Sequence, residues 1–395
     1  MFEISFDDII LSLYLFSDDS EILVTGKRNA YHEVASKKMR NFTHSQICKV
    51  DNWPKLVESL EFKVHRPSVI KEGIHTTLLH EAFGRFVDTN NSTNYDGIDA
   101  ADFEFTHKFC TEMSKFYTGS NGEDRRRDIA NELLCDYLGK TIVESLAYKG
   151  SSSRTDGTLF TSLGNDVLLQ IPIAILEVEV ELGLGGGDPT MEGLAYYVFT
   201  VLHGMNPKAA QIARQFSVVP LLLLSIVGPY IAFNFVAAGE TFVLDPATSF
   251  LPCLVLPFDI KMMEKTARTF RAMKECIQNL HDFYSKLSTQ NATNPRCEQL
   301  SFPYIHDFEF HDEIVHFDYD ERRFNKLVFF AHVTSEGAEI PKDTMIAVKF
   351  TRTYSPEAHM ACWNYFQSIS ALPLRMSGFA RWLENGCNGA LDRNG

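Results

Sequence analysis

Apolar residues that recur every three or four positions predict a long helix from Asp259 to Leu287. The residues of this stripe are Met263, Ala267, Phe270, Met273, Ile277, Leu280, Tyr284 and Leu287. Weaker patterns predict shorter helices over 70–86, 101–117 and 128–144. A further helix is expected to begin at Asp188-Pro189 and run to His203, because Asp caps free backbone N–H groups and Pro is tolerated in a first helical turn.

An uncharged run from Gln215 to Gly239 is long enough to span a membrane as one helix. Gly228-Pro229 interrupts it near the middle, and the residue before a proline is pushed out of the helical region. The run is also rich in β-branched and aromatic residues, which favour strands. We therefore predict two buried strands joined by a turn at Gly228-Pro229-Tyr230, rather than a membrane helix.

Acidic and apolar residues alternate at the end of a third run, Val167 to Leu182, which is predicted to be a strand. Successive side chains of a strand point to opposite faces, so Glu177, Glu179 and Glu181 should share one face. Carboxylates stacked in this way repel one another. They are tolerable in water, beside cations or around a metal ion.

The composition narrows the class of protein. Hydrophobic residues make up 45% of the 395, which is enough for a substantial core, and the formal net charge of −14 argues against a protein that coats nucleic acid non-specifically. The eight cysteines contain no Cys-x-x-Cys pair, which is typical of reduced thiols inside cells. The first residues are acidic where a signal peptide would be basic. We expect a cytoplasmic or nuclear protein.

Asp156, in Arg154-Thr-Asp156-Gly157, is the candidate partner for the acidic strand. An acid on one strand and an acid-x-acid on the next could hold Mg²⁺, which accepts one or two carboxylates together with waters and phosphate. Such a cation polarises phosphate and lowers the pKa of an attacking water, as nuclease chemistry requires. On spacing alone, an ordinary exposed strand face and an Asp-Gly turn are the favoured explanation of Asp156, Glu177 and Glu179, because such acids are common.

Two further patterns have a functional and a simpler interpretation. Basic residues line one side of the long helix and could neutralise nucleic-acid phosphates, although a solvated helix face is the more common reason for such a stripe. These residues are Lys261, Lys265, Arg268, Arg271 and Lys274. Lys349, in Ile346-Ala-Val-Lys349-Phe350, occupies the place of the phosphate-pairing lysine of a kinase strand, with Glu357 as its candidate ion-pair partner.

In combination, these motifs resemble the Crinkler-type proteins of fungi, which join a restriction-endonuclease-like module of the PD-(D/E)XK class to a protein-kinase-like domain. The first part of the resemblance covers about residues 100–290, and the second covers the tail from Leu327 onward. The motifs that carry it are Arg154-x-Asp156-Gly157, Leu176-Glu177-Val178-x-x-Glu181-x-Gly183-x-Gly-Gly-x-Asp188-Pro189, Gly228-Pro229-Tyr230, Asp282-Phe-Tyr284-x-x-Leu287, Leu327-Val-Phe-Phe-Ala331 and Val348-Lys-Phe-Thr-Arg352.

The resemblance implies a fold class of α/β (α+β) type, with a mixed central sheet, flanking helices and a small β-rich segment near the C-terminus. The expected divisions are an N-terminal region of unknown role (1–100), a nuclease-like domain (101–290), a linker (291–300) and a truncated kinase N-lobe (301–395).

The resemblance also implies site residues. Asp156 and Glu177 would be metal ligands, with Glu132 as an auxiliary acid. Position 179 would normally hold a catalytic lysine, and here it is Glu179, which removes a cation from the expected site. Three hypotheses follow: a Mg²⁺-dependent nuclease in which Glu179 assists, a catalytically inactive interaction or effector protein, and a fragment that binds ATP through Lys349. No kinase activity is expected, because the catalytic loop and the Asp-Phe-Gly motif are missing.

Overall fold

The structure is a computed structural model, and the parts of the chain that it describes are as follows. They are residues 2–6, 9–16, 49, 52, 63–64, 74–92, 98–119, 121–144, 146–147, 154–164, 166–182, 187–203, 206–239, 241–287, 300–310, 313–322, 327–336 and 340–351. All statements below concern these residues. Glu357 and the linker predicted at 291–300 lie outside them, except for Leu300.

The main sheet holds eight strands, seven of them in the order β3-β11-β10-β9-β8-β7-β4, and β12 pairs with β10. The strands are β3 (Lys63–Val64), β4 (Ile142–Val143), β7 (Gly157–Leu163), β8 (Asp166–Glu179), β9 (Leu221–Val227), β10 (Tyr230–Ala238), β11 (Phe242–Pro246) and β12 (Leu251–Pro252). β8 pairs with β9 in parallel, whereas β7 with β8 and β9 with β10 are antiparallel. The sheet is therefore mixed, as predicted.

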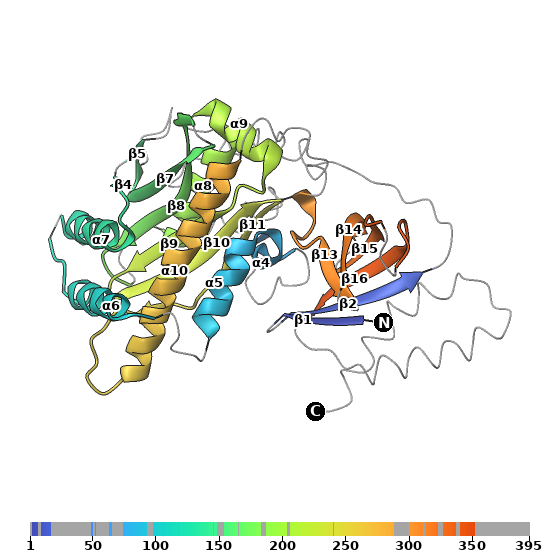
Figure 1. Ribbon diagram of the computed structural model, residues 1–395. Coiled ribbons are helices and arrows are strands. Elements are labelled where there is room, and N and C mark those ends of the chain that lie inside the picture. The colour runs from blue at the N-terminus through green and yellow to red at the C-terminus, as the bar shows by residue number, and fades with distance from the viewer. Residues whose placement is uncertain are drawn as a thin grey trace.

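Helices cover both faces of this sheet (Figure 1). They are α4 (Thr76–Leu79), α5 (Glu81–Asn91), α6 (Ala100–Met113), α7 (Gly122–Leu138), α8 (Pro189–His203), α9 (Pro207–Phe216) and α10 (Ile260–Lys286). Leu224 of β9 lines one small cavity with Ile277 of α10, and its neighbour Leu223 packs against Gly193 of α8. Because adjacent strand residues point to opposite faces, α10 and α8 lie on opposite sides of the sheet.

A second sheet is antiparallel and curled, in the order β1-β2-β16-β15-β14-β13 (Figure 1). Its strands are β1 (Phe2–Phe6), β2 (Ile9–Phe16), β13 (Asp307–Phe310), β14 (Glu313–Arg322), β15 (Val328–Val333) and β16 (Met345–Thr351), and a separate pair joins β5 (Leu146–Ala147) to β6 (Arg154–Thr155). The first hairpin of the chain thus joins strands of the predicted C-terminal lobe. Together the two sheets and their helices confirm the predicted fold class.

The uncharged run forms two strands, as predicted. β9 and β10 make an antiparallel hairpin, in which Tyr230 pairs with Val227. The turn between them places Gly228 at φ 56°, a left-handed conformation that glycine adopts without strain. No helix in the described part of the chain is both long enough and apolar enough to cross a membrane.

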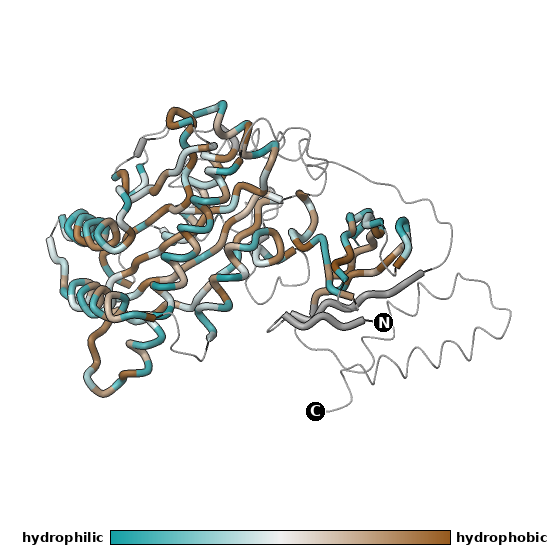
Figure 2. Tube along the Cα trace, in the orientation of Figure 1, coloured by the Kyte–Doolittle hydropathy of each residue, from teal (hydrophilic) through white to brown (hydrophobic). Residues whose placement is uncertain are grey.

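The long helix and the helix after Asp188-Pro189 begin where the sequence predicts. Asp259 accepts a hydrogen bond from the Met262 N–H, and Asp188 accepts one from the Met191 N–H. The strands of the main sheet are largely hydrophobic, whereas the helices around them carry hydrophilic positions (Figure 2). This distribution is typical of helices that bury one stripe and expose the other.

Several predicted boundaries are wrong. The segment predicted as one helix over 70–86 forms two, α4 and α5, which meet at His80 and end at Asn91, and α6 ends at Met113 rather than at residue 117. Two further differences lie near Asp156. Helix α7 begins at Gly122 rather than at residue 128 and ends at Leu138, because Gly139 adopts the left-handed conformation (φ 62°) that closes many helices. Strand β8 ends at Glu179 rather than at Leu182. Both differences change which acidic side chains lie near Asp156.

Candidate metal and phosphodiester site

The antiparallel hairpin of β7 and β8 brings Asp156 opposite Glu177. Gly157 pairs with Leu176, so the preceding residue, Asp156, lies across from the following one, Glu177. Opposite residues of an antiparallel pair project from the same face, with their Cβ atoms about 5 Å apart. Asp156 is also bound to β8, because its Oδ2 accepts a hydrogen bond from the Val178 N–H at 2.8 Å. The structure therefore brings these two predicted site residues together.

Three further acids surround this pair, and the five together are called the acid cluster below. Its members are Glu123, Asp156, Glu177, Glu179 and Glu192. Glu123 lies in the first turn of α7, and Glu192 lies in the first turn of α8. Three separate elements thus direct carboxylates to the end of the β7–β8 hairpin.

Burial and mutual repulsion favour the protonated forms of these acids. Burial, and after it the charges of Glu123 and Glu192, raise the pKa of Asp156 to about 7, although the Val178 N–H and Arg127 oppose the shift. Burial and then the same two glutamates raise the pKa of Glu179 to about 7. Burial and the neighbouring Asp156 raise the pKa of Glu177 well above its ordinary range. A cation among these groups would remove much of this repulsion.

Glu177 is the member of the acid cluster that most clearly lacks a polar partner for a buried atom. Its residue is only 3% exposed, and its Oε1 has no hydrogen-bond partner among the described residues. A buried carboxylate oxygen without a partner is unfavourable, and such a group in a native protein calls for an explanation such as a bound ion. In the parallel register Glu177 lies beside Ser225, whose hydroxyl contacts that of Thr190 at 3.1 Å.

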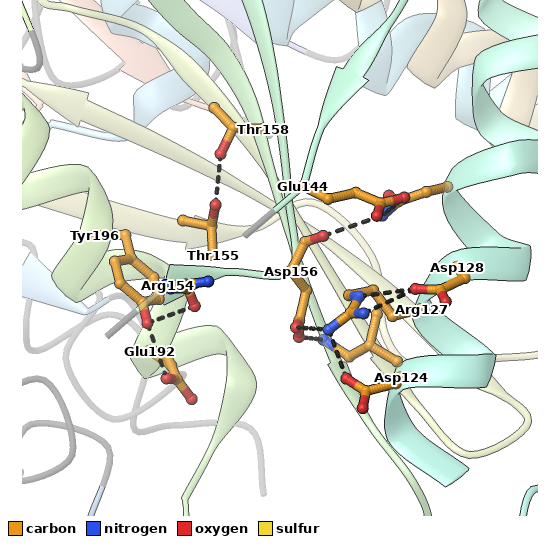
Figure 3. A network of polar contacts seen from close by, with 12 residues as sticks. Asp124, Arg127, Asp128, Glu144, Arg154, Thr155, Asp156, Thr158, Glu192 and Tyr196 are labelled. Carbon is orange, nitrogen blue, oxygen red and sulfur yellow. Dashed lines mark hydrogen bonds and ion pairs between the residues drawn. The ribbon is translucent and has the colours of Figure 1, made fainter. Parts of the chain in front are cut away.

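Arg127 of α7 is the basic residue that contacts Asp156 (Figure 3). Its Nη1 lies 3.9 Å from Asp156 Oδ1 and 2.7 Å from Asp124 Oδ1. Its Nε and Nη2 donate to Asp128 Oδ1 at 3.1 and 2.8 Å. The guanidinium is thereby held at the edge of the acid cluster. The sequence draws attention to Arg125-Arg-Arg127 only as a basic run.

Asn131, one helical turn further along α7, holds the backbone before β7. Its Nδ2 donates to the Asp156 carbonyl at 3.0 Å, and its Oδ1 is buried with no partner among the described residues. A Cβ atom at Gly157 would lie 2.7 Å from that Oδ1 and 2.9 Å from Ile142 Cγ2. The absence of a side chain at Gly157 therefore lets α7 approach the start of β7.

We expect Gly157→Ala to destabilise the protein by about 1–3 kcal/mol, because the added methyl group overpacks a closed contact. The measurement is the free energy of unfolding in urea. Gly119→Ala, where nothing lies within 4 Å of the added Cβ but φ is 91°, serves as a control for backbone strain without overpacking. A Gly157→Ala protein as stable as the wild type would show that the Asn131 contact is not close in solution.

Two acids that the sequence suggests for this site lie elsewhere. Glu132 is exposed on α7, and the side chain that reaches Asp156 from this part of the helix is that of Asn131. Glu181 lies beyond the end of β8, and its Oε1 accepts from Arg126 at 3.1 Å instead of extending the carboxylate row. Glu123, in the first turn of α7, is the acid of this helix whose charge raises the pKa of Asp156.

As the side chains stand, no group of three or more His, Cys, Asp or Glu residues in the described part of the chain could hold a metal ion. Asp156 still bonds to the backbone of β8, so its carboxylate is engaged in the sheet. Mg²⁺ needs only one or two protein carboxylates, because waters and substrate phosphate complete its ligands. Asp156 and Glu177 together fit that smaller requirement.

The predicted basic stripe on α10 is partly used inside the molecule. Arg271 pairs with Glu275 at 2.7 Å and approaches Asp102 at 3.9 Å. Lys274 Nζ lies 4.5 Å from the centre of the Tyr137 ring. Lys261 and Lys265 are exposed, and Arg268 is half-buried. The stripe is therefore not a continuous row of cations open to a phosphate backbone.

Lys349 lies on β16, opposite Val328 of β15 and Ser12 of β2. Its side chain is half-buried. Its expected partner, Glu357, is outside the described residues, so the predicted ion pair remains a prediction. Neither Val328 nor Ser12, the residues paired with Lys349 on the two neighbouring strands, is acidic.

Comparisons with known proteins do not assign the chain to a family. No family model matches the sequence, and no match was found among curated proteins or solved structures.

Proposed function

We propose that this protein is a divalent-metal-dependent phosphodiesterase that cleaves nucleic acid at the acid cluster. The observation that supports this function best is the juxtaposition of Asp156 and Glu177 across the β7–β8 hairpin, where burial and like charge raise the pKa of both carboxyls. The resemblance to the PD-(D/E)XK class, carried by the same residues, leads to the same reaction. Enzyme active sites commonly hold groups with such shifted pKa values.

In the proposed site Asp156 and Glu177 would bind Mg²⁺. When bound, the cation would polarise the phosphate and make water a stronger nucleophile. The unpartnered Glu177 Oε1 is the ligand atom that the protein leaves available. Asp156 would present Oδ1, since its Oδ2 accepts from the Val178 N–H.

Glu179 would accept the proton of the attacking water. It stands two residues after Glu177 on β8, so the two side chains share a face, and Glu179 is only half-buried. Burial raises its pKa to about 7, which is close to the value at which a general base works best near neutral pH. A glutamate at this position is therefore suited to proton transfer, whereas the lysine that the resemblance implies would supply charge.

The decisive experiment is cleavage of DNA and RNA in Mg²⁺ or Mn²⁺ by the wild type, Asp156→Asn and Glu177→Gln. We expect each substitution to lower the rate at least ~100-fold, because it removes a charged ligand while it preserves side-chain volume. Asp136→Asn, at an exposed position of α7, is the matched control and should cleave like the wild type.

Equal cleavage by the wild type and Asp156→Asn would contradict the proposal. A folded wild type that cleaves neither DNA nor RNA would favour the inactive interaction or effector protein, which is the second hypothesis from the sequence.

A further inference from the structure

The acid cluster would repel a phosphodiester substrate wherever its members are ionised, as they would be around a bound cation. All five members are carboxylic acids, and Asp188 also raises the pKa of Glu179. A phosphodiester carries one negative charge and gains more on its non-bridging oxygens as water adds to phosphorus. The resemblance implies a lysine at position 179 that would meet this charge, but the residue there is Glu179. Another cation of the protein would therefore be required near the metal ligands.

Arg127 has the position and the geometry for this task. It is the guanidinium that approaches Asp156, and its charge lowers the pKa values of both Asp156 and Glu123. Its side chain is 17% exposed, so it is reachable from solvent, whereas the neighbouring Arg126 is fully buried. Arg126 is therefore an internal residue, whereas Arg127 can contact a ligand that arrives from solvent.

The contacts of Arg127 fix its orientation but do not use all of its N–H donors. Asp124 and Asp128, on the same helix, accept from Nη1, Nε and Nη2. The distance to Asp156 is 3.9 Å, which is an ion-pair distance and longer than a hydrogen bond. A guanidinium has five N–H donors in a planar fork and can bind two phosphate oxygens at once. These hydrogen bonds use three of the five donors, and Nη1, the atom nearest Asp156, carries one of those that remain.

We propose that Arg127 is a catalytic residue that binds the non-bridging oxygens of the phosphate under attack, in place of the lysine expected at position 179. This inference rests on the proposed function. In the reaction, water oxygen forms a bond to phosphorus, and its proton passes to Glu179. The bond from phosphorus to the leaving ribose oxygen breaks, and that oxygen takes a proton from solvent. Arg127 stays charged throughout and stabilises the pentavalent state.

The test compares Arg127→Ala and Arg127→Lys with Arg125→Ala, an exposed arginine of the same helix that lies 6.0 Å from the Tyr117 ring. Steady-state cleavage should show kcat lowered at least ~100-fold in Arg127→Ala, with KM changed no more than about threefold, as for loss of a transition-state donor. Arg127→Lys should recover part of the rate. Added guanidinium ion should restore Arg127→Ala at least ~10-fold and leave the wild type unchanged.

Mn²⁺ affinity, measured by calorimetry without substrate, separates a catalytic role from a structural one. Loss of a cation beside the acid cluster should leave Mn²⁺ binding by Arg127→Ala unchanged or tighter. Cleavage by Arg127→Ala at the wild-type rate would overturn the inference and leave the proposed function intact, and so would a lost rate accompanied by lost Mn²⁺ binding. An inactive wild type would overturn both.

Discussion

Replacement of Arg126 by methionine is expected to lower the free energy of unfolding by about 3–5 kcal/mol. Arg126 is fully buried, and its guanidinium donates to three backbone carbonyls and one carboxylate. The acceptors are the carbonyls of Met113, Lys115 and Gly228, and Glu181 Oε1. Methionine fills a similar volume without any donor, so these acceptors lose a partner in a place that water does not reach.

The effect should be large because Arg126 joins three separate segments. It connects the end of α6, the segment after β8 and the turn between β9 and β10, and it lies 4.6 Å from the centre of the Tyr117 ring. Denaturation in urea at pH 7 measures the loss. Arg125→Met, at the exposed neighbouring position, should change stability by no more than about 0.5 kcal/mol. Equal stability of the two variants would show that the buried contacts are not made in solution.

Neutralising Glu177 is expected to raise the free energy of unfolding, whereas replacing Arg126 lowers it. In EDTA at pH 8, Glu177→Gln should be more stable than the wild type by about 2 kcal/mol or more, because it removes a carboxyl group whose ionisation is opposed by burial and by Asp156. Glutamine has nearly the same volume as glutamate, so the packing around β8 is retained.

The pH dependence follows from the direction of the pKa shifts. Asp156 and Glu179 have folded-state pKa values of about 7, above their unfolded values near 4, so the folded state binds protons more tightly than the unfolded state. Metal-free wild type should therefore become more stable as the pH falls from about 8 to about 5, and this gain should be reversed as the pH rises through 7. Glu177→Gln should show a flatter profile, because one member of the repelling group is absent.

Stabilisation by Mn²⁺ at pH 8 tests the same acid cluster. A ligand at 100 times its Kd stabilises the state that binds it by about 2.7 kcal/mol, so Mn²⁺ should raise the melting temperature of the wild type by several degrees. Glu177→Gln should show little of this rise, whereas Asp136→Asn should show all of it. A wild type that is insensitive to both pH and Mn²⁺ would contradict the existence of a repelling acid cluster.

Local sequence signals predicted the parts of the fold that depend on neighbouring residues. The stripe of α10, the turn at Gly228-Pro229 and the start of α8 at Asp188-Pro189 each follow from helix periodicity, glycine conformation or capping, and all three are found in the structure. The pairing of Asp156 with Glu177 does not follow from the turn alone: counted from Leu163 opposite Asp166, Asp156 would face Ile173, and two register shifts in the hairpin bring Glu177 opposite it instead.

The rest of the candidate site depends on how distant elements pack. Arg127 and Glu123 reach the acid cluster because α7 begins earlier than its apolar pattern indicates and lies close to the start of β7. Glu181 fits the alternation of β8, but the strand ends before it and Arg126 binds it. Gly157 is a local signal for the close approach of α7, but in the sequence an Asp-Gly pair indicates only a turn.

The pairing of β2 with β16 affects the order in which the protein folds. Ile10 pairs in register with Thr351, so this ladder joins residues that are far apart in the sequence. Bringing such remote segments together carries a large loop-closure entropy, and contacts of this kind form late in folding. During synthesis on the ribosome, the initial hairpin would emerge long before its partner strand. Its open edge would be a site for errant association until β16 has been synthesised.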